Sequence, residues 1–306
     1  MPETIAVFDV GSNSIKLLVA KTGPGAFEIL HEDLRTTRLI AAMRPGKPLD
    51  PQAVEATLAV LKTFRAKAVE LGAGFGFAAG TCALRIAADA EEFTERVQKE
   101  TRIRLVVLSG EEEGELAFLG ATSDVTGKEH VVVDIGGGST ECIAGINGRI
   151  QWAKSFPMGA VTMTERFLRA DPPALEESDR FQVHIDRVLK PVFDQPPGRR
   201  AALILVGGAV AAAAALIGKL AAPKPSLVHG RELNLRDLMT LHQKLLRLSS
   251  KDRRRLPGMD PDRSDILPAG LQILLTLMNR WNTGRARVSA RGLRHGLAIQ
   301  RMRGLR

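Results

Sequence analysis

The chain has 306 residues, two cysteines and a formal net charge of +9. This length favours two domains, because a single core rarely grows beyond about 250–300 residues, and the two cysteines exclude a disulfide framework and favour a reducing, cytoplasmic setting. The basic excess favours an anionic partner, whereas an aromatic content of 4% without tyrosine argues against nucleic acid, because single-strand binders use aromatic stacking.

The first predicted elements are three antiparallel strands around a tight polar loop. The N-terminus has no basic leader or cleavable apolar segment, so we expect no signal peptide. The apolar run 5–10 contains Asp9 near its end and leads into the loop GSNS; a second apolar run, a turn at 22–25 and a third run follow. Gly and Ser leave backbone N–H groups open, which is typical of anion-binding loops. The candidate phosphate-binding residues here are Gly11, Ser12, Asn13 and Ser14.

Helices and strands then alternate through the first half. The spacing of apolar residues predicts a helix over 50–73, with Asp50 as cap and Gly72 as stop, then a strand leading into GTCALR. Arg85 in that segment has a planar, permanently charged fork suited to phosphate. The alternative is an ordinary surface arginine at the start of a helix. A further helix over 87–102 and a strand over 103–108 complete this stretch.

The segment SGEEEGEL, residues 109–116, allows two interpretations. Ser109 is a typical N-cap, and glutamates in a first turn suit the helix dipole. Alternatively, crowding raises the pKa of one carboxylate, which can then take a proton from an attacking water. The pattern alone leaves open which of Glu111, Glu112 and Glu113 points inward.

The stretch VVVDIGGGSTECIAG, residues 131–145, repeats the N-terminal pattern of an apolar run, an aspartate and a loop of small residues. Asp134 again precedes a small-residue loop, a second apolar run and a turn, here Asn147-Gly148, which is a strong hairpin signal. Asp134 follows Asp9 by 125 residues, so we infer a domain-scale duplication. We predict domains at 1–126 and 127–306, with the last helix free to pack back on the first domain. The second candidate phosphate loop comprises Gly136, Gly137, Gly138, Ser139 and Thr140.

Two carboxylates, Asp134 and Glu141, flank the second loop. A carboxylate beside a phosphate is repulsive unless a cation lies between them, and Mg²⁺ typically takes one or two carboxylates with phosphate oxygens and waters. Asp134 and Glu141 are therefore candidate metal ligands, and Asp9 is a less certain third. The alternatives are that Asp134 caps its own loop and that Glu141 is an ordinary alternating strand residue.

The remainder of the chain predicts an α/β domain. Helices are expected around 160–195, 232–249 and 264–281. Residues 201–218 carry no charge and approach the length of a membrane span. We instead interpret them as a buried strand, a Gly207-Gly208 turn and an Ala-rich helix. Strands interleaved with helices throughout the chain indicate the α/β class.

Seven segments in this order are similar to one known family: FDVGSNSIKLLVA, GTCALRIA, SGEEEGELAFLGA, VVVDIGGGSTE, FPMGAVTMTERF, LVGGAVAAAAAL and LPGMDPDRSDILPAGLQIL. The chain resembles the exopolyphosphatase / guanosine pentaphosphate phosphatase (Ppx/GppA) family, of the short, two-domain type. The resemblance implies two actin-like, ribonuclease H-like domains with the active site in the cleft between them. It also implies that water attacks the terminal phosphoryl group of inorganic polyphosphate and releases orthophosphate.

The resemblance assigns roles to the candidate residues. It implies that Glu113 is the catalytic base, that Arg85 and the two loops bind phosphate, and that Asp134 and Glu141 hold Mg²⁺, with Mn²⁺ as a substitute. The resemblance further implies that the protein binds polyphosphate or, as an alternative substrate, guanosine penta- or tetraphosphate. We expect it to act in the cytoplasm, without a membrane partner, and a homodimer is an open possibility. Two further alternatives are a phosphate- or alarmone-binding regulator with weak catalysis and an actin-like kinase or filament former.

Two departures from the family pattern affect the expected substrate. Gly114-Glu115 replaces a common Ala-Arg pair, which makes that rim less favourable for a polyanion. Ala209 stands where a threonine is usual after the Gly-Gly pair, which removes a hydroxyl from a loop that touches nucleotide in actin-like relatives. The second change tilts the expectation slightly away from a nucleotide substrate.

Overall fold

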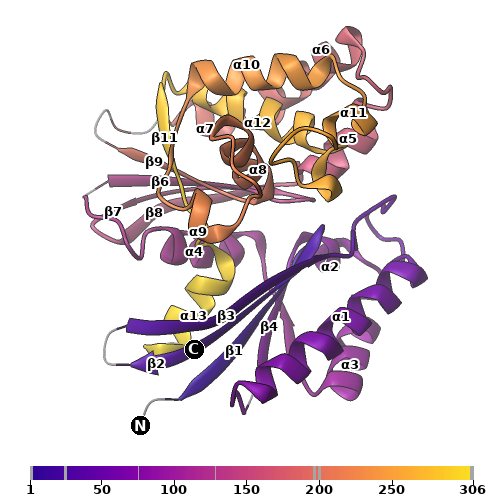
Figure 1. Ribbon diagram of the computed structural model, residues 1–306, viewed down its shortest axis with the longest axis vertical. Coiled ribbons are helices and arrows are strands. Elements are labelled where there is room, and N and C mark those ends of the chain that lie inside the picture. Colours follow the sequence, from indigo (N-terminus) through magenta and orange to yellow (C-terminus); the bar gives the residue numbers. More distant parts are fainter. Residues whose placement is uncertain are drawn as a thin grey trace. The chain divides into compact units, whose positions relative to one another are not determined.

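The computed structural model in Figure 1 describes residues 3–23, 26–74, 76–127, 129–195, 198 and 201–303. The chain forms two compact units: unit 1 comprises Met1–Gly120 and Leu293–Arg306, and unit 2 comprises Ala121–Gly292. The predicted boundary lies at 126/127, whereas the structure divides the chain at 120/121 and returns the residues from Leu293 onward to the first unit.

Unit 1 contains a mixed five-stranded sheet in the order β3-β2-β1-β4-β5. The first three strands are antiparallel, as predicted, and β4 and β5 continue the sheet parallel to β1. The turn expected at 22–25 falls partly on residues outside the described chain. The strands are β1 (Thr4–Val10), β2 (Ser14–Gly23), β3 (Ala26–Thr36), β4 (Gly76–Gly80) and β5 (Arg104–Val107).

The helices of unit 1 follow the local signals in the sequence. Asp50 accepts a hydrogen bond from the Ala53 N–H at the start of the first helix, and Gly72 has a φ of +83° just beyond its end. Both predicted signals are therefore confirmed. The helices are α1 (Pro51–Glu70), α2 (Cys82–Ile86), α3 (Ala90–Thr101), α4 (Gly110–Ala121) and α13 (Leu293–Met302).

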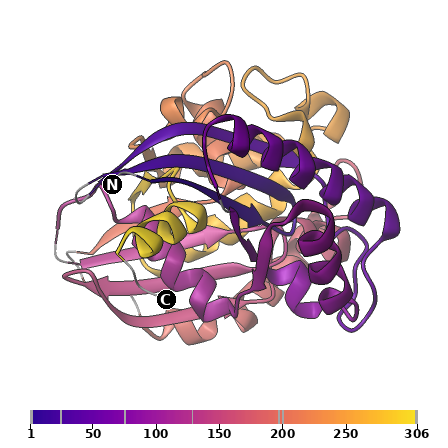
Figure 2. The same cartoon turned by 90° about the horizontal axis from the view of Figure 1, so that it is seen from below.

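The C-terminal helix α13 completes the core of unit 1. Figure 2 shows it in yellow against the indigo strands, and Ala298 packs with Ile5 and Leu18 from β1 and β2. Gly296 touches the carbonyl of Leu116 so closely that a Cβ at this position would overlap the α4 backbone. Close approach of two helices therefore depends on this glycine.

Unit 2 repeats the sheet of unit 1. Its strand order is β10-β11-β9-β6-β7-β8, so β8-β7-β6-β9-β11 matches β3-β2-β1-β4-β5, with β10 added at the edge. Asn147 and Gly148 both have positive φ in the hairpin between β7 and β8, as predicted. The predicted α/β class and the duplication are confirmed. The strands are β6 (Glu129–Ile135), β7 (Thr140–Ile146), β8 (Arg149–Phe156), β9 (Ala202–Val206), β10 (Glu232–Asn234) and β11 (Arg285–Val288).

The helices of unit 2 enclose the buried helix α12. Gly270 on α12 leaves room for α8, because a Cβ at Gly270 would lie 2.7 Å from the Ala209 methyl group. The prediction of a helix over 232–249 was wrong at its start: residues 232–234 are a strand, and the Asn234 side chain caps the helix that follows. The short strand β11 was not predicted. The helices are α5 (Ala160–Phe167), α6 (Leu175–Val188), α7 (Lys190–Phe193), α8 (Gly208–Ile217), α9 (Pro225–Val228), α10 (Leu235–Leu246), α11 (Ser250–Arg253), η1 (Pro261–Arg263) and α12 (Leu267–Arg280).

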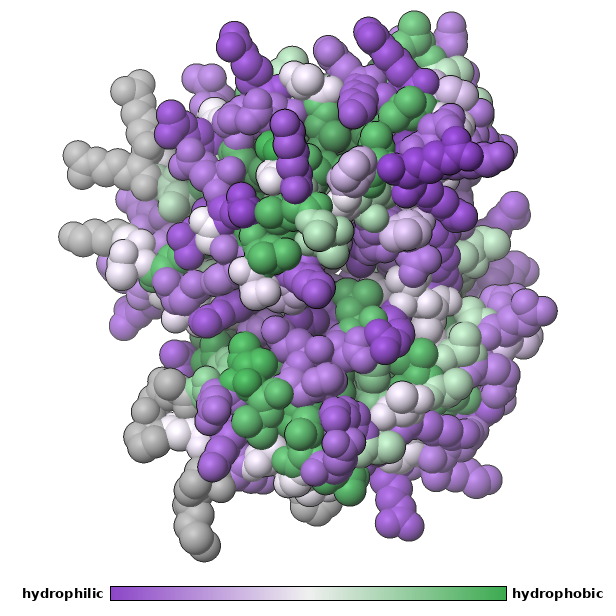
Figure 3. Space-filling model, viewed as in Figure 1, coloured by the Kyte–Doolittle hydropathy of each residue, from purple (hydrophilic) through white to green (hydrophobic). Residues whose placement is uncertain are grey.

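The uncharged segment 201–218 forms the predicted strand, Gly-Gly turn and helix, as β9 and α8. Across the described chain, every helix is too short or too polar to cross a bilayer. The face drawn in Figure 3 is mostly hydrophilic, with its hydrophobic residues in small separate groups. Such scattered apolar side chains are normal on protein surfaces and need no partner.

Candidate functional site

The loop between β1 and β2 presents open backbone donors. A Cβ at Gly11 would lie 2.8 Å from the Ser14 carbonyl oxygen, so only glycine allows this tight turn. The Ser12 carbonyl accepts from the Ile40 N–H and the Asn13 carbonyl accepts from the Arg38 N–H. The N–H groups of Gly11, Ser12 and Asn13, in contrast, have no acceptor among the described residues. Three such successive N–H groups can hold an anion.

The side chains of Ser12 and Asn13 in this loop differ in the contacts they make. The Ser12 hydroxyl oxygen accepts a 3.0 Å hydrogen bond from the Ala83 N–H at the start of α2, so Ser12 ties the loop to that helix. The Asn13 carboxamide is buried, and within the described part of the chain neither its nitrogen nor its oxygen has a hydrogen-bond partner. A buried unpaired amide costs about 1–3 kcal/mol, which a bound phosphate accepting from its NH₂ group would offset in part.

Asp9 forms an ion pair with a lysine that the sequence analysis did not single out. Lys16 lies directly across the β1–β2 ladder, and its Nζ is 2.7 Å from Asp9 Oδ2. Asp9 is almost fully buried, whereas the Lys16 side chain is about one-third exposed. Lys16 thus supplies at Asp9 the positive charge that we expected from a metal ion. The role of Asp9 as a metal ligand stays a prediction, and one of its oxygens is already bound.

The structure brings together two residues predicted from separate motifs, Arg85 and Glu113. Arg85 Nη1 on α2 lies 2.6 Å from Glu113 Oε2 on α4, and the same nitrogen donates to the Leu108 carbonyl at 3.2 Å. Both side chains are mostly buried, with 19% and 13% of their surface exposed. The ion pair stabilises the carboxylate form of Glu113 and fixes its direction.

The three neighbouring glutamates of α4 have different environments. The Glu112 carboxylate accepts from the Ser109 N–H at 2.8 Å while the Ser109 hydroxyl oxygen accepts from the Glu112 N–H, which is a capping box. These hydrogen bonds to Ser109 lower the pKa of Glu112. Glu111 is exposed, and only Glu113 turns inward. Helix geometry therefore settles what the sequence left open.

The GGGST loop of unit 2 rests on the first turn of α5. The Gly136 and Gly137 carbonyls accept from the Ala160 and Val161 N–H groups, both at 2.9 Å. A Cβ at Gly159 would overlap the backbone of Gly137, so this contact needs glycine. The N–H groups of Gly137, Gly138 and Ser139 have no acceptor in the described part of the chain. The second loop thus offers the same three-donor arrangement as the first.

Ser139 and Thr140 differ in what their hydroxyl groups can do. Thr140 is fully buried, and its hydroxyl donates to the Met158 carbonyl at 2.6 Å. Its proton is therefore committed inside the protein. Ser139 is also buried, but its hydroxyl has no hydrogen bond to the described residues. Of these two predicted phosphate-binding residues, Ser139 is the better placed to donate from its side chain.

Asp134 and Glu141 lie directly opposite each other across the β6–β7 ladder. Their side chains share one face of the sheet, where like charges destabilise each other unless a cation lies nearby. Glu141 is 1% exposed, and Ser155 on β8 donates to its Oε1 at 2.7 Å. Within the described residues no group of three or more His, Cys, Asp or Glu side chains could hold a metal. The pair fits Mg²⁺, which often has only one or two protein carboxylates and takes its other ligands from phosphate and water.

A third glycine segment, at Gly207 and Gly208, closes around the end of β6. Gly207 has a φ of +109°, and a Cβ there would overlap the Ile135 carbonyl and lie 3.0 Å from Asp134 Oδ1. A Cβ at Gly208 would overlap the Arg263 guanidinium, which is itself held by Asp260 at 3.1 Å. The backbone contact and positive φ require glycine at position 207, whereas a side chain at position 208 would displace Arg263. Arg263 brings a buried positive charge to the N-terminus of α8.

Three residues near the predicted site were missed in the sequence: Lys16, Ser155 and Arg263. Lys16 carried a usable signal, because it is the only charged residue in the otherwise buried stretch 14–20. Ser155 carried none, since its position depends on strand register. Arg263 lies in one of the segments that carry the family resemblance, but its contact with Gly208 depends on the fold of the 260–266 segment. The predicted residues of unit 1 lie around the β1–β2 loop, and those of unit 2 around the β6–β7 loop. Their chemical roles stay predictions.

The comparisons with known proteins agree on one protein family. The sequence model of the Ppx/GppA phosphatase family matches residues 18–304. The structure of the Aquifex aeolicus PPX-GPPA enzyme is 31% identical, with 98% of this chain and 100% of that chain covered and a TM-score of 0.83. An exopolyphosphatase from Cytophaga hutchinsonii is 25% identical over 99% of each chain, with a TM-score of 0.91. An exopolyphosphatase-like protein is 27% identical over 99% of this chain and 98% of its own, also at 0.91.

Proposed function

Because this chain belongs to the Ppx/GppA phosphatase family, we propose that it is a cytoplasmic exopolyphosphatase that releases orthophosphate from the end of inorganic polyphosphate. The observation that carries the proposal is the repeated loop: each unit has three successive N–H groups that find no acceptor among the described residues, beside a buried carboxylate. Donors of this kind suit the oxygens of a phosphate chain. The net charge of +9 favours approach of the same polyanion.

In this proposal each loop binds phosphate within its own unit, and Arg85 adds a further donor in unit 1. Gly11, Ser12 and Asn13 bind one phosphoryl group through their N–H groups, and Gly137, Gly138 and Ser139 bind another. Arg85 lies within hydrogen-bonding distance of Glu113, so a phosphate that reaches the guanidinium is brought next to the proposed base. Fixed donors aimed at phosphoryl oxygens need little reorganisation during transfer, and phosphoryl transfer depends mainly on such positioning and charge.

Glu113 acts as the general base in this proposal. Its carboxylate accepts a proton from water as the water oxygen attacks the terminal phosphorus. The bond from that phosphorus to the bridging oxygen breaks, and the shortened polyphosphate leaves with the electron pair. Arg85 holds the Glu113 carboxylate in one direction before the attack.

Charge on the phosphate chain must be neutralised for this reaction to proceed. Asp134 and Glu141 would hold Mg²⁺, or Mn²⁺ in its place, and the ion would supply that neutralisation when bound. Ser155 fixes one oxygen of Glu141 and so limits the directions in which this carboxylate can bind. Lys16 and Arg263 add fixed positive charge beside the two loops.

Hydrolysis of guanosine pentaphosphate by the same residues is the alternative. The catalytic steps would be identical, and only contacts to the base and ribose would differ. Ala209 instead of a threonine after Gly207-Gly208 favours polyphosphate, because it leaves the loop without a side-chain hydroxyl. The buried Arg85–Glu113 pair argues against a purely binding regulator, since binding phosphate does not require a base.

The test measures orthophosphate release from long polyphosphate, short polyphosphate and guanosine pentaphosphate, with Mg²⁺ and with EDTA. We expect release from polyphosphate that requires Mg²⁺, and a kcat lower by about 10²–10⁴-fold for Glu113→Gln. Glu111→Gln is the matched control, because Glu111 is exposed on the same turn of α4. Equal rates for wild type and Glu113→Gln would remove the base assignment, and no release from any polyphosphate would remove the proposed function.

A further inference from the structure

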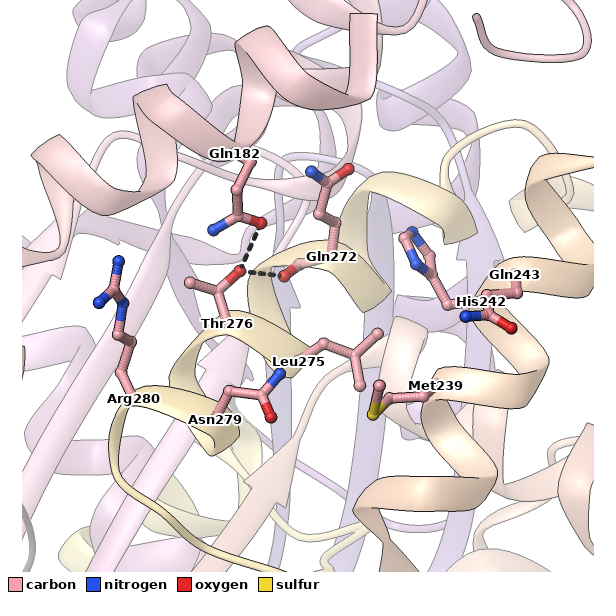
Figure 4. Close-up of a pocket in the computed structure, with 9 residues that line it drawn as sticks. All are labelled: Gln182, Met239, His242, Gln243, Gln272, Leu275, Thr276, Asn279 and Arg280. Atoms are coloured by element: carbon pink, nitrogen blue, oxygen red, sulfur yellow. Dashed lines mark hydrogen bonds between the residues drawn. The ribbon is translucent and has the colours of Figure 1, made fainter. Parts of the chain in front are cut away.

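Unit 2 contains a pocket of about 280 Å³ that shares no residue with the two phosphate loops. Figure 4 shows it between α6, α10 and α12, with Gln182 contributed by α6, Met239 and His242 by α10, and Gln272 and Thr276 by α12. His242 and Gln272 lie toward one end, and Arg280 lies at the other. The volume is at the small end for ligand sites, which suits a single heterocycle.

Gln272 lines this pocket, and its side-chain oxygen is a hydrogen-bond acceptor that no described residue pairs. Its side-chain NH₂ group donates to the Ser178 carbonyl at 2.8 Å. A carbonyl oxygen can only accept, so the orientation of the carboxamide is fixed by this contact. The Gln272 side-chain oxygen is consequently turned away from Ser178, and it is buried without a hydrogen-bond partner among the residues that the structure describes.

His242 supplies a second hydrogen-bond acceptor at this pocket, one of its two ring nitrogens. Burial lowers the pKa of His242 to about 4, helped by the charge of Arg253 and opposed by a hydrogen bond to the Pro268 backbone, so the ring is neutral at pH 7. Proline has no N–H, so its backbone can only accept, and the ring nitrogen facing it carries the proton. The other nitrogen, Nε2, has no partner in the described chain, and in the neutral ring it is therefore a lone-pair acceptor.

The charges around the pocket select against ions. Its described lining includes no carboxylate, and its one arginine, Arg280, is held by Asp186 through two hydrogen bonds of 2.9 and 2.5 Å. A cation would meet the positive charges of Arg280 and of the nearby Arg253, and no carboxylate of the described lining could bind it. An anion would face the lone pairs of His242 and Gln272. A neutral ligand with N–H groups matches both acceptors, which are costly to leave buried and unpaired.

We propose that this pocket binds a neutral, planar ligand of about purine size that presents two neighbouring N–H donors to His242 Nε2 and Gln272 Oε1. Leu275 and Met239 supply apolar surface for the faces of the ring. Both acceptors are shielded from water, so a lining side chain must move to admit the ligand. Met239 is 42% exposed, unbranched and flexible, and it is the side chain that can move at least cost.

Guanosine is a suitable probe, because its N1–H and N2–H groups are adjacent donors. The experiment titrates guanosine into the full chain with ¹³C-methyl methionine, and follows the Met239 methyl resonance by NMR. We expect a saturable shift of this resonance. 1-Methylguanosine lacks the N1–H donor, and we expect it to bind about 5- to 10-fold more weakly, the usual effect of losing one neutral hydrogen bond.

His242→Phe tests the acceptor directly, because it keeps an aromatic ring and removes Nε2. We expect guanosine binding to fall about 5- to 10-fold, while the melting temperature stays equal or rises since an unpaired polar atom is removed. Lys244→Ala, at an exposed position of α10 outside the pocket, is the control and retains binding. Three results overturn the proposal: an unmoved Met239 resonance, equal affinity for the two nucleosides in the wild-type chain, or unchanged binding by folded His242→Phe. Phosphate release from polyphosphate is measured separately and does not depend on the outcome.

Discussion

At the scale of single residues, the environment of each carboxylate decides what it can do. Glu112 is tied to the backbone of its own helix, Glu113 is paired with Arg85, and Asp9 is paired with Lys16. Glu141 has a different partner, the neutral hydroxyl of Ser155. A hydroxyl donor of this kind orients one carboxylate oxygen of Glu141 without neutralising the carboxylate.

Ser155→Ala is expected to weaken Mg²⁺ binding and to lower the free energy of unfolding by about 1.5–3 kcal/mol, because a buried charged acceptor loses its donor. The measurement is the shift of the melting temperature with Mg²⁺ concentration, together with chemical denaturation in EDTA. Ser155→Thr keeps the hydroxyl and should restore the Mg²⁺ midpoint. A midpoint identical in wild type and Ser155→Ala would contradict the orienting role.

At the scale of elements, each glycine-rich loop is shaped by a neighbouring element rather than by its own sequence. The GGGST loop is fixed by the first turn of α5, whose N–H groups bind the loop carbonyls. The GSNS loop is fixed by the segment 37–40 and by the start of α2. In both loops the carbonyls are turned inward by these contacts, which leaves the N–H groups for an anion.

Gly159→Ala is expected to impair phosphate binding by displacing the GGGST loop. The added Cβ would overlap the Gly137 backbone, and overpacking of this kind costs about 1–3 kcal/mol. Steady-state kinetics on polyphosphate should show a raised KM or a lowered kcat, or both. Gly284→Ala is the matched control, because a Cβ at Gly284 meets open space and its backbone is unstrained. If the two variants behave alike, the loop does not depend on this contact.

At the scale of the whole chain, the fold joins segments that are far apart in sequence. The C-terminal helix α13 returns to unit 1, where Arg294 Nη2 and His295 Nε2 lie 2.5 and 3.3 Å from Glu32 Oε1 on β3. Burial opposes ionisation of Glu32, but the hydrogen bonds and charges of His295 and Arg294 outweigh it and lower the pKa of Glu32 to about 2. The contact therefore anchors the end of the chain through a carboxylate.

The depressed pKa of Glu32 predicts an acid-sensitive contribution to stability. The carboxylate stabilises the fold fully above its unfolded pKa of about 4.5, and this contribution is lost as the pH falls from there towards 2. Wild type should therefore lose stability relative to Glu32→Gln by up to about 1.4 kcal/mol per pH unit in that window. Urea unfolding of both proteins between pH 6 and 3.5 measures the difference. A stability difference that does not change with pH would show that this carboxylate does not titrate as described.

The sequence by itself determined the class of the fold, the duplication, the two loops and the glycine and cap positions that bound α1. These features depend on local periodicity and turn chemistry, which neighbouring residues express without the rest of the chain. The strand at 232–234 and the short strand β11 were not predicted from the sequence, because three or four residues are too few to show a periodicity of apolar side chains.

Only the tertiary structure decided which side chains meet. The inward turn of Glu113 toward Arg85, the pairs Lys16–Asp9 and Ser155–Glu141, and the closeness of Arg263 to Gly208 all follow from helix facing, strand register or close packing. The return of α13 to unit 1 and the pocket beside His242 arise from contacts between segments distant in the chain. Such contacts leave no local pattern, because their free energy comes from burial that exists only once the chain has folded.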